Sequence, residues 1–341
     1  SIVLEMVSDA PAGEILGETT KEYTFEACGE TLDMAQLQEI WEAKLEPVYP
    51  YRKAGPTVEP ITGSLTAPAA PKIGVAKPKV IIPVFPGTNC EYDTAKAFAR
   101  AGADPEILVI RNLTPADVTA SCEALVKAID NSQIVMLPGG FSGGDEPDGS
   151  AKFIASFFRS PAVTEAVRRL LQQRDGLMLG ICNGFQALIK LGLVPYGDIR
   201  PITAYDPTLT FNTIGRHQSM LVRTRVASNM SPWLQKTHAG DIHTVAISHG
   251  EGRFVAVDGV LERLKLKGQI ATQYVDLDGD PTMDLRFNPN GSALAIEGIT
   301  SPDGRVLGKM GHTERAGHDL YKNVEGDRFQ PIFEGGVAYF R

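Results

Sequence analysis

The sequence of 341 residues lacks most features of secreted, membrane-spanning and nucleic-acid-binding proteins. Its four cysteines are far apart and include no CxxC pair, which excludes a disulfide scaffold and favours a reducing compartment. It contains no run of about 18 apolar residues, and its first residues do not resemble a signal peptide. The formal net charge of -8 argues against a nucleic-acid-binding surface. We therefore expect a cytosolic globular protein whose partners are small molecules or other proteins.

Composition divides the chain into three parts. Residues 1–50 contain two strand-like segments, 1–7 (SIVLEMV) and 21–27 (KEYTFEA), and a helical pattern over 33–45, which together predict a small α+β fragment. Residues 51–78 are rich in proline, alanine and glycine and predict a linker, partly extended along a neighbouring surface. Because the chain starts abruptly inside a strand-like pattern, we expect it to be part of a longer polypeptide.

The third part, residues 79–341, is expected to form one domain in which strands and helices alternate. Strands are predicted at 79–85, 106–110, 133–140 and 177–179, and helices at 91–100, at 114–128 and in a region broken around Pro161. Further strands are predicted at 219–226, 242–248, 270–276, 293–300 and 306–310, some of them antiparallel. Strands that alternate with helices and have uninterrupted apolar sequences are typical of a parallel sheet covered on both faces. The predicted fold class is α/β, a mostly parallel doubly wound sheet with added antiparallel strands.

A cysteine in the segment GICNGFQ, residues 180–186, is the first candidate for catalysis. Cys182 follows a short apolar strand, and a glycine and a helical pattern follow it, which is typical of a nucleophile at a sharp strand-to-helix turn. At a helix N-terminus, backbone N–H groups and the helix dipole favour the thiolate. This context indicates covalent catalysis through a thioester. The alternative is an inert buried cysteine.

A cysteine nucleophile needs a base, and the base needs an orienting group on its other nitrogen. Six histidines are candidates: His217, His238, His243, His249, His312 and His318. His312 is the strongest, because it follows the strand-like VLGKM and precedes Glu314 by two residues. If the backbone stays extended, both side chains lie on similar sides near the carboxyl edge of the sheet, where active sites of such folds lie. A surface histidine beside an acid is the alternative.

A glycine-rich segment, PGGFSGGD at residues 138–145, ends the third strand at the same edge. Glycines let the backbone approach a ligand, so the N–H groups of Gly139 and Gly140, with that of Asn183, are candidates for an oxyanion hole. A tight turn that ends the strand is the alternative. Gln186 lies four residues after the cysteine and is either a contact for a polar substrate or a solvated helix residue. No residue set predicts a metal site, and no GxxxxGK loop predicts independent ATP binding.

These motifs carry a resemblance to a known family. GICNGFQ, PGGFSGGD and MGHTER, in this order and spacing, resemble the motifs of the class I (triad) glutamine amidotransferases, which have a flavodoxin-like fold. The flanking segments PGTNCEYD, ISHGEGRF, NPNGS and ITSPDGRVLGKMGH are similar to one branch, the glutaminase portions of the phosphoribosylformylglycinamidine synthases of purine biosynthesis. The resemblance runs from about Lys79 to the C-terminus. Residues 1–50 resemble the end of the synthetase portion of those enzymes.

The resemblance implies a role for each candidate residue. Cys182 attacks the side-chain amide of glutamine, His312 moves protons and Glu314 orients His312. A glutamyl thioester forms, ammonia leaves and water releases glutamate. The implied oxyanion donors are Gly139, Gly140 and Asn183, and the residue implied to contact bound glutamine is Gln186.

The resemblance also implies partners and cofactors. Ammonia passes to the synthetase portion, expected in the same natural polypeptide, where ATP and Mg²⁺ support the conversion of formylglycinamide ribonucleotide to formylglycinamidine ribonucleotide. No cofactor is expected in this chain itself. Many members read HPER where this chain reads HTER, so Thr313 lacks the fixed φ of proline and a looser geometry between His312 and Glu314 is expected.

Two other interpretations stay open. One is a degenerate, non-catalytic module with an amidotransferase-like fold that serves binding or scaffolding. The other is a related cysteine hydrolase that acts on a different amide.

Overall fold

The computed structural model describes residues 3–6, 13–48, 54–63, 71, 74–142, 151–317 and 320–341. Parts of four expectations lie outside these residues: the ends of the strand at 1–7, linker residues such as 64–70, the glycine-rich segment after Ser142, and His318. The chain divides into two compact units, Ser1–Pro50 and Tyr51–Arg341.

The first unit contains a β-hairpin followed by a helix. Strand β1 (Thr24–Ala27) pairs antiparallel with β2 (Glu30–Asp33), and α1 (Met34–Ala43) follows directly. Asp33 caps this helix, because its Oδ1 accepts hydrogen bonds from two N–H groups of the first turn at 2.8 and 3.1 Å. The small α+β fragment expected from the sequence is confirmed.

The strand expected at residues 1–7 is not formed where the chain is described. Residues 3–6 are exposed and have no strand conformation. A strand needs a partner for its backbone hydrogen bonds, and β1 pairs only with β2 among the described strands. The prediction for residues 3–6 is therefore wrong.

The second unit is built on a nine-stranded sheet with the order β4-β3-β5-β6-β13-β12-β11-β8-β9. Its parallel strands are β3 (Lys79–Val84), β4 (Asp104–Val109), β5 (Ile134–Leu137), β6 (Leu177–Ile181) and β13 (Val306–Lys309). Its antiparallel extension consists of β12 (Ile296–Thr300), β11 (Ile270–Val275), β8 (Gln218–Val226) and β9 (Ile242–His249). A separate pair is formed by β7 (Thr208–Thr210) and β10 (Arg253–Val255). The predicted α/β class with added antiparallel strands is confirmed.

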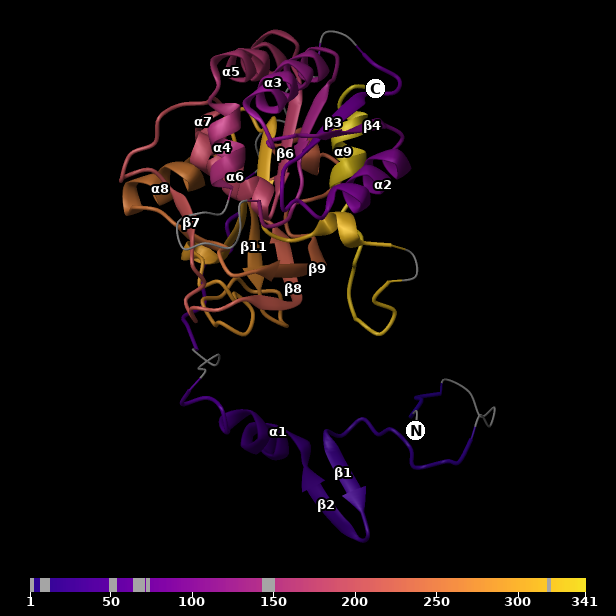
Figure 1. Cartoon of the computed structure of the whole chain (residues 1–341). Coiled ribbons are helices and arrows are strands. Elements are labelled where there is room, and N and C mark those ends of the chain that lie inside the picture. The colour runs from indigo at the N-terminus through magenta and orange to yellow at the C-terminus, as the bar shows by residue number, and fades with distance from the viewer. Residues whose placement is uncertain are drawn as a thin grey trace. The chain divides into compact units, whose positions relative to one another are not determined.

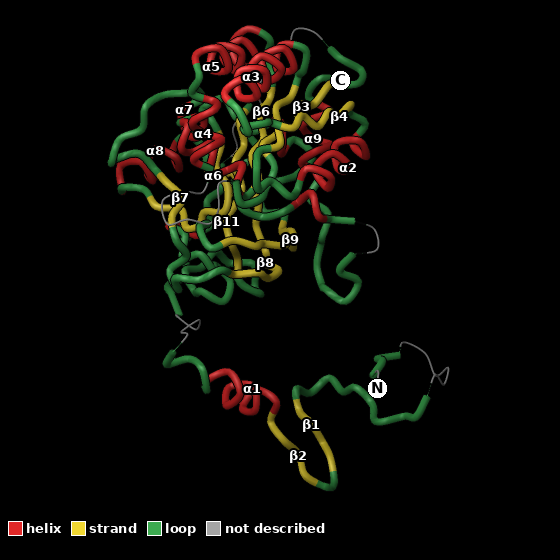
Figure 2. The backbone as a smooth tube through the Cα atoms, in the orientation of Figure 1, coloured by secondary structure: helices red, strands yellow, loops and turns green. Residues whose placement is uncertain are grey.

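Helices cover both faces of the parallel strands, as Figures 1 and 2 show. One face carries α2 (Glu91–Ala101) and α9 (Ile332–Ala338). The other carries α3 (Pro115–Asp130), α4 (Lys152–Phe158), α5 (Pro161–Arg168) and α6 (Asn183–Leu191). The remaining helical segments are α7 (Leu193–Tyr196), α8 (Asp258–Leu266), a π-turn at Arg169–Gln173 and 3₁₀ turns at Pro232–Leu234, Ala293–Ala295 and Thr313–Arg315. The doubly wound arrangement follows from these two layers.

Helix boundaries in this unit follow local sequence signals. Thr114 caps α3 in a reciprocal capping box with Asp117. Pro161 occupies the first turn of α5. Backbone N–H groups in a first turn have no intrahelical acceptor, so proline breaks no helical hydrogen bond there. Gly102 ends α2 with φ of 91°, a conformation that favours glycine.

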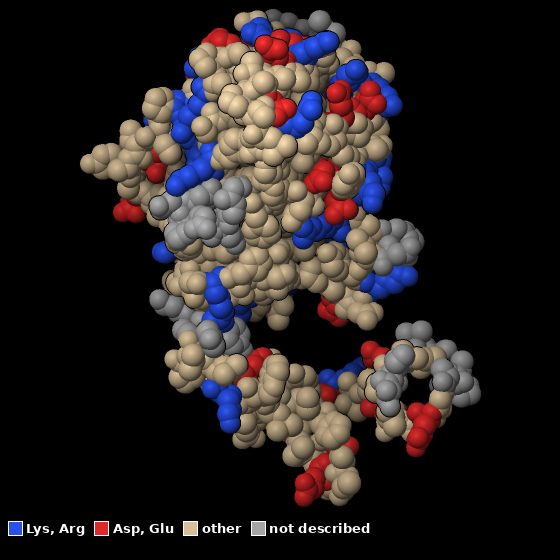
Figure 3. Space-filling view, viewed as in Figure 1, with Lys and Arg blue, Asp and Glu red and all other residues tan. Residues whose placement is uncertain are grey.

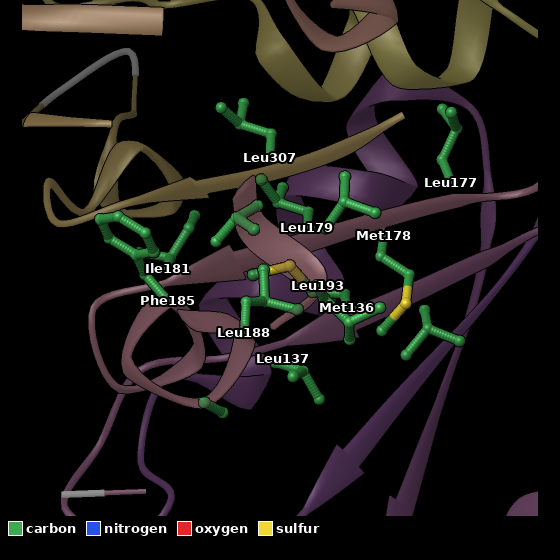
Figure 4. Packing of buried hydrophobic residues seen from close by; sticks show 14 of the residues in the cluster. Met136, Leu137, Leu177, Met178, Leu179, Ile181, Phe185, Leu188, Leu193 and Leu307 are labelled. Atoms are coloured by element: carbon green, nitrogen blue, oxygen red, sulfur yellow. The ribbon is translucent and has the colours of Figure 1, made fainter. Parts of the chain in front are cut away.

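The central strands are buried on both faces, which explains their uninterrupted apolar sequences. Every residue of β5 and β6 is buried. Figure 4 shows side chains of β5, β6, α6 and β13 meeting in one cluster that includes Met136, Leu179, Phe185 and Leu307. Each such side chain contributes about 1.5–3 kcal/mol by leaving water. This packing fixes the end of β6, which Cys182 directly follows.

Part of the predicted linker lies along the antiparallel half of the sheet. In the stretch 54–63, the N–H of Gly63 donates to the carbonyl oxygen of Ala227 and the N–H of Ile61 to Oε1 of Gln273, both at 2.9 Å. The Ile61 side chain is buried. The expected course along a neighbouring surface is observed for these residues.

Basic and acidic side chains are both distributed over the visible face of the molecule (Figure 3). None of the helices in the described ranges is long and apolar enough to cross a membrane.

Candidate functional site

Cys182 lies at the sharp turn between β6 and α6. It is the N-cap residue of α6, with φ of 52° and ψ of -107°. Such a conformation costs a non-glycine residue about 1–3 kcal/mol and is concentrated at functional sites. Its side chain is buried, and Sγ lies 3.8 Å from the carbonyl oxygen of Ser248. The strand-to-helix turn predicted from GICNGFQ is confirmed.

Two glycines permit this turn. A Cβ on Gly184 would lie 1.9 Å from the carbonyl oxygen of Leu137, and a Cβ on Gly180 would lie 2.6 Å from the carbonyl oxygen of Gly184. Both distances are far shorter than a van der Waals contact. Only hydrogen in these positions lets α6 begin so close to β5 and β6.

Gly184→Ala is expected to destabilise the chain by about 3 kcal/mol, because the added methyl overlaps a backbone atom that cannot rotate away. Gly259→Ala is the matched control. Gly259 lies in α8 with no atom within 4 Å of an added Cβ, and alanine favours a helix over glycine by up to about 1 kcal/mol. Urea unfolding measures both variants. Parent-like stability of Gly184→Ala would contradict the close packing at the turn.

His312 and Glu314 form a buried pair just beyond β13. Nδ1 of His312 and Oε1 of Glu314 are 2.6 Å apart, and the residues are 3% and 2% exposed. The proximity predicted for these side chains is confirmed. The extended backbone expected between them is wrong, because Thr313–Arg315 forms a 3₁₀ turn instead. The turn, rather than strand alternation, brings the two side chains together.

The charges of this site reinforce one another. Burial disfavours the imidazolium, but the charges of Glu314 and Cys182 and hydrogen bonds with the Cys182 and Cys90 thiols outweigh it, and the pKa of His312 is raised well above its ordinary value. Burial also disfavours the ionised carboxyl, but the charge and hydrogen bond of His312 lower the pKa of Glu314 below its ordinary value. Both shifts favour the ion pair of a protonated His312 and an ionised Glu314. The N–H of Cys182 donates to the carbonyl oxygen of Lys309 at 2.9 Å, so the nucleophile candidate adjoins the strand that leads to His312.

Cys90 is a second buried thiol at the same place, and its position was not predicted from the sequence. Its Sγ lies 3.9 Å from Nδ1 of His312 and accepts a hydrogen bond from Nη2 of Arg315 at 3.1 Å. Cys90 is the N-cap residue of α2. The available signal was PGTNCEYD, in which the cysteine precedes a helical pattern. Gly139 packs against the His312 ring and the Cys90 sulfur. A Cβ at Gly139 would lie 2.7 Å from Cε1 of His312 and 3.1 Å from that sulfur.

The donor atoms of Cys90, His312 and Glu314 lie within 4.8 Å of one another, which makes them the one group among the described residues that could hold a metal ion. Thiolate, imidazole and carboxylate are all ligands that zinc accepts. Here the Nδ1 of His312 already pairs with Glu314, and the Arg315 cation points at the sulfur. These contacts arrange the group as a hydrogen-bonded set, and we assign no metal to it.

The predicted oxyanion donors lie around the same residues. Gly140 has φ of 147° and forms a bridge with Thr88. The N–H groups of Gly139 and Gly140 donate to no backbone acceptor in the part of the chain that is described. Asn183 is the first residue of α6, where a backbone N–H has no intrahelical acceptor. These three N–H groups can serve a ligand, and their role as an oxyanion hole stays a prediction.

Gln186 is buried rather than solvated. Its Oε1 accepts a hydrogen bond from Nδ2 of Asn183 at 2.9 Å, and its Nε2 donates to the carbonyl oxygen of Glu251 at 2.5 Å. Oγ of Ser142 in turn donates to Oδ1 of Asn183 at 2.6 Å. These bonds connect the start of α6 to the glycine-rich segment and to the loop after β9. The solvated alternative is excluded, and contact with a substrate stays a prediction.

The other described histidines lack an equivalent partner. His217 and His238 are exposed. His243 is buried, and the carboxylate 3.8 Å from it is mostly exposed. His249 is buried with no hydrogen-bond partner for either ring nitrogen among the described residues. Burial and two neighbouring histidines lower the pKa of His249 to about 3, so it is neutral where His312 is charged.

A pocket adjoins these residues. It is lined by Phe211, Gly215, Arg216, His217, Gly250 and Glu251. The loop that supplies two of them follows Ser248, whose carbonyl oxygen is 3.8 Å from the Cys182 sulfur. The pocket lining therefore includes the loop that follows the Ser248 carbonyl at the Cys182 sulfur, and it contains one basic and one acidic residue.

Comparison with known proteins places this geometry in a family. Residues 77–340 match the family described as the CobB/CobQ-like glutamine amidotransferase domain. Phosphoribosylformylglycinamidine synthase subunit PurQ from Chlorobium chlorochromatii is 35% identical over 244 residues, covering 71% of this chain and 90% of that protein. The PurQ subunit from Aquifex aeolicus is 33% identical over 254 residues, covering 73% of this chain and 95% of that protein.

A solved structure supports the same relationship. One chain in the structure of PurLQS from Thermotoga maritima is similar with a TM-score of 0.55 and 25% identity, covering 78% of this chain and 100% of that chain. The shared fold, the family match and the related sequences agree. This chain belongs to the glutamine amidotransferase family, as a member of the PurQ type.

Proposed function

We propose that this chain is the glutaminase portion of a phosphoribosylformylglycinamidine synthase. It hydrolyses glutamine to glutamate through a cysteinyl thioester, and its ammonia serves the ATP-dependent conversion of formylglycinamide ribonucleotide to formylglycinamidine ribonucleotide in purine biosynthesis. One observation carries the proposal: Cys182 occupies a strained turn at a helix N-terminus, and its N–H donates to Lys309, at the end of the strand that leads to the buried His312–Glu314 pair. Similarity to PurQ subunits supports the reaction class.

In the proposed reaction, the Cys182 thiolate attacks the side-chain amide carbon of glutamine and the amide oxygen becomes an oxyanion. The N–H groups of Gly139, Gly140 and Asn183 stabilise that charge. The His312 imidazolium gives its proton to the nitrogen as the C–N bond breaks, so ammonia leaves and a glutamyl thioester remains. Neutral His312 then takes a proton from water, whose oxygen attacks the thioester. Glutamate leaves, and the thiolate–imidazolium pair is restored.

The surroundings of the site support an amino acid as substrate. The adjoining pocket, whose lining contains Arg216 and Glu251, is proposed to take the amino-acid end of glutamine. Gln186 is proposed to fix the pocket wall through its bond to the Glu251 carbonyl and to contact the bound glutamine.

The proposed enzyme has further parts besides the glutaminase domain. Residues 1–50 are assigned to the end of the synthetase portion, 51–78 to a linker and 79–341 to the glutaminase domain. Joined to its synthetase portion, expected in the same polypeptide, the enzyme acts as a cytoplasmic ligase, with ATP and Mg²⁺ at the synthetase site and no cofactor in this chain. The PurLQS structure from Thermotoga maritima, which contains a similar chain, supports such a partner.

A glutamine analogue that carries a chloroketone in place of the amide tests the proposal. Peptide mass spectrometry is expected to find the label on Cys182, because a helix N-terminus and a nearby histidine activate a thiol as a nucleophile. L-glutamine is expected to protect Cys182, and D-glutamine serves as the control that does not. Equal labelling of Cys90 and Cys122, without protection, would favour a non-catalytic binding module.

A further inference from the structure

We propose that the hydroxyl of Thr313, held by the buried Lys309–Glu297 ion pair and by Gln330, positions His312 for proton transfer. This inference rests on the proposed function, because it presumes that His312 moves protons in glutamine hydrolysis. The four residues are positioning residues that act through the backbone on either side of His312.

Lys309 and Glu297 form an ion pair inside the protein, between β13 and β12. Their side chains are 1% and 0% exposed, and Nζ lies 3.3 Å from Oε1. Moving two charges out of water costs several kcal/mol per ion, which is offset only when their other polar atoms are also bonded. Two apolar residues would fill the same volume without this cost. The ion pair therefore points to a role in fixing local geometry.

Three other hydrogen bonds of this pair fall on the two neighbours of His312, and Oε2 of Glu297 also accepts one from the Thr272 hydroxyl. Nζ of Lys309 donates to the carbonyl oxygen of Gly311 at 2.9 Å and to Oγ1 of Thr313 at 2.8 Å. Oε1 of Glu297 accepts a hydrogen bond from the N–H of Gly311 at 2.6 Å. The three ammonium protons thus have three acceptors. The pair therefore holds the residues immediately before and after His312 in place.

The Thr313 hydroxyl links the Lys309–Glu297 pair to the segment that precedes α9. It accepts from Lys309 and donates to Oε1 of Gln330 at 2.9 Å, in a residue that is 4% exposed. Proline at this position would fix φ through its ring, whereas threonine leaves φ free. The looser geometry expected from threonine is not observed, since His312 and Glu314 are 2.6 Å apart. The side-chain bonds of Thr313 supply the restriction that its backbone lacks.

Thr313→Val removes the hydroxyl at nearly constant volume and tests the proposal on the full chain. Because a misplacement of about 1 Å can cost about 10²-fold in rate, we expect kcat for glutamine to fall about 10- to 100-fold with KM within about twofold of the parent. Thr313→Ser keeps the hydroxyl and is expected to retain most of kcat. Thr237→Val is the matched control, since Thr237 is a buried threonine whose hydroxyl bonds the Leu234 carbonyl at 2.8 Å outside the site.

Alkylation of Cys182 by iodoacetamide gives a readout that a purely structural role would not move. A neighbouring imidazolium favours the ionised form of a cysteine thiol. Displacing His312 in Thr313→Val is therefore expected to move the alkylation profile of Cys182 to higher pH, while Thr237→Val leaves it unchanged. Peptide mass spectrometry separates Cys182 from the other thiols.

The proposal is overturned if Thr313→Val keeps the kcat and the alkylation profile of the parent, or if Thr313→Ser loses as much activity as Thr313→Val. If Thr313→Val does not fold, Gln330→Met removes the acceptor of the same hydroxyl, and a kcat lowered by about fivefold supports the proposal; an unchanged kcat overturns it. A parent chain that does not hydrolyse glutamine contradicts the proposed function instead. The alkylation profiles then still test the positioning of His312.

Discussion

Cys182→Ala is expected to lower the rate of glutamine hydrolysis by at least about 10⁴-fold, because no thioester can form without the sulfur. The other buried thiol nearby, Cys90, is bonded to Arg315 and Asn89 at the start of α2 and does not occupy the strained turn. The fold is expected to persist, since the substitution removes a single atom and keeps the backbone conformation. A glutamate-release assay measures the rate, and thermal unfolding measures the fold.

Cys122→Ser is the matched control for this substitution. Cys122 lies on α3, where its sulfur is 3.5 Å from Oγ of Ser160, and parent activity is expected. Turnover by Cys182→Ala above about 1% of the parent rate would contradict the assignment of the nucleophile, given the losses typical of removing one.

Glu314→Gln is expected to lower kcat by about 10³-fold while preserving the shape of the site, because an amide cannot stabilise the imidazolium that gives up the proton. The Glu314 charge helps to raise the pKa of His312. Without that charge the imidazolium is lost at lower pH, so the alkaline limb of the kcat/KM profile is expected to move to lower pH. A pH–rate profile of the parent and the variant measures both effects.

The same pair contributes to stability over a defined pH window. The raised pKa of His312 stabilises the fold fully below the ordinary histidine pKa of about 6.5, and this contribution is lost as pH rises through the raised value. The lowered pKa of Glu314 stabilises the fold above the ordinary glutamate pKa of about 4.3, and this contribution is lost as pH falls through the lowered value. Parent and Glu314→Gln should therefore differ most in stability at mildly acidic pH.

Glu123→Gln removes the same charge from an exposed position on α3 and is expected to leave both profiles unchanged. A Glu314→Gln variant with parental kcat and an unshifted alkaline limb would show that the carboxylate does not support His312.

The candidates that the sequence identified are those with a local pattern. A strand, a glycine two residues later and a helical pattern indicate the turn at Cys182 without knowledge of the rest of the fold. The two-residue spacing of His312 and Glu314 indicates their proximity in the same way. Apolar runs such as 79–85 predict parallel strands because burial on both faces needs no polar alternation.

Features that depend on distant parts of the chain were not predicted. The Lys309–Glu297 pair joins two strands, and its signal was a charged residue inside each of two apolar segments, which indicates a buried partner but does not name it. Helix α9 contains Gly335 and Gly336, which disfavour a helix. It forms because these glycines let it approach Trp233, whose atoms would lie 2.3 and 2.2 Å from the added Cβ atoms.

The strand predicted at residues 1–7 failed for a related reason. Its alternating pattern is local, whereas a strand forms only where a second strand bonds to it, and the described residues 3–6 have none.

Capture of the covalent intermediate is the decisive test of whether Cys182 is the nucleophile. The parent chain is mixed with isotope-labelled glutamine, quenched in acid within one turnover, digested and mapped by mass spectrometry. We predict a glutamyl thioester on the peptide that contains Cys182, cleaved by hydroxylamine and absent from Cys182→Ala. Glutamine hydrolysis with no adduct on Cys182 at any quench time, or with the adduct on Cys90, would show that Cys182 is not the nucleophile.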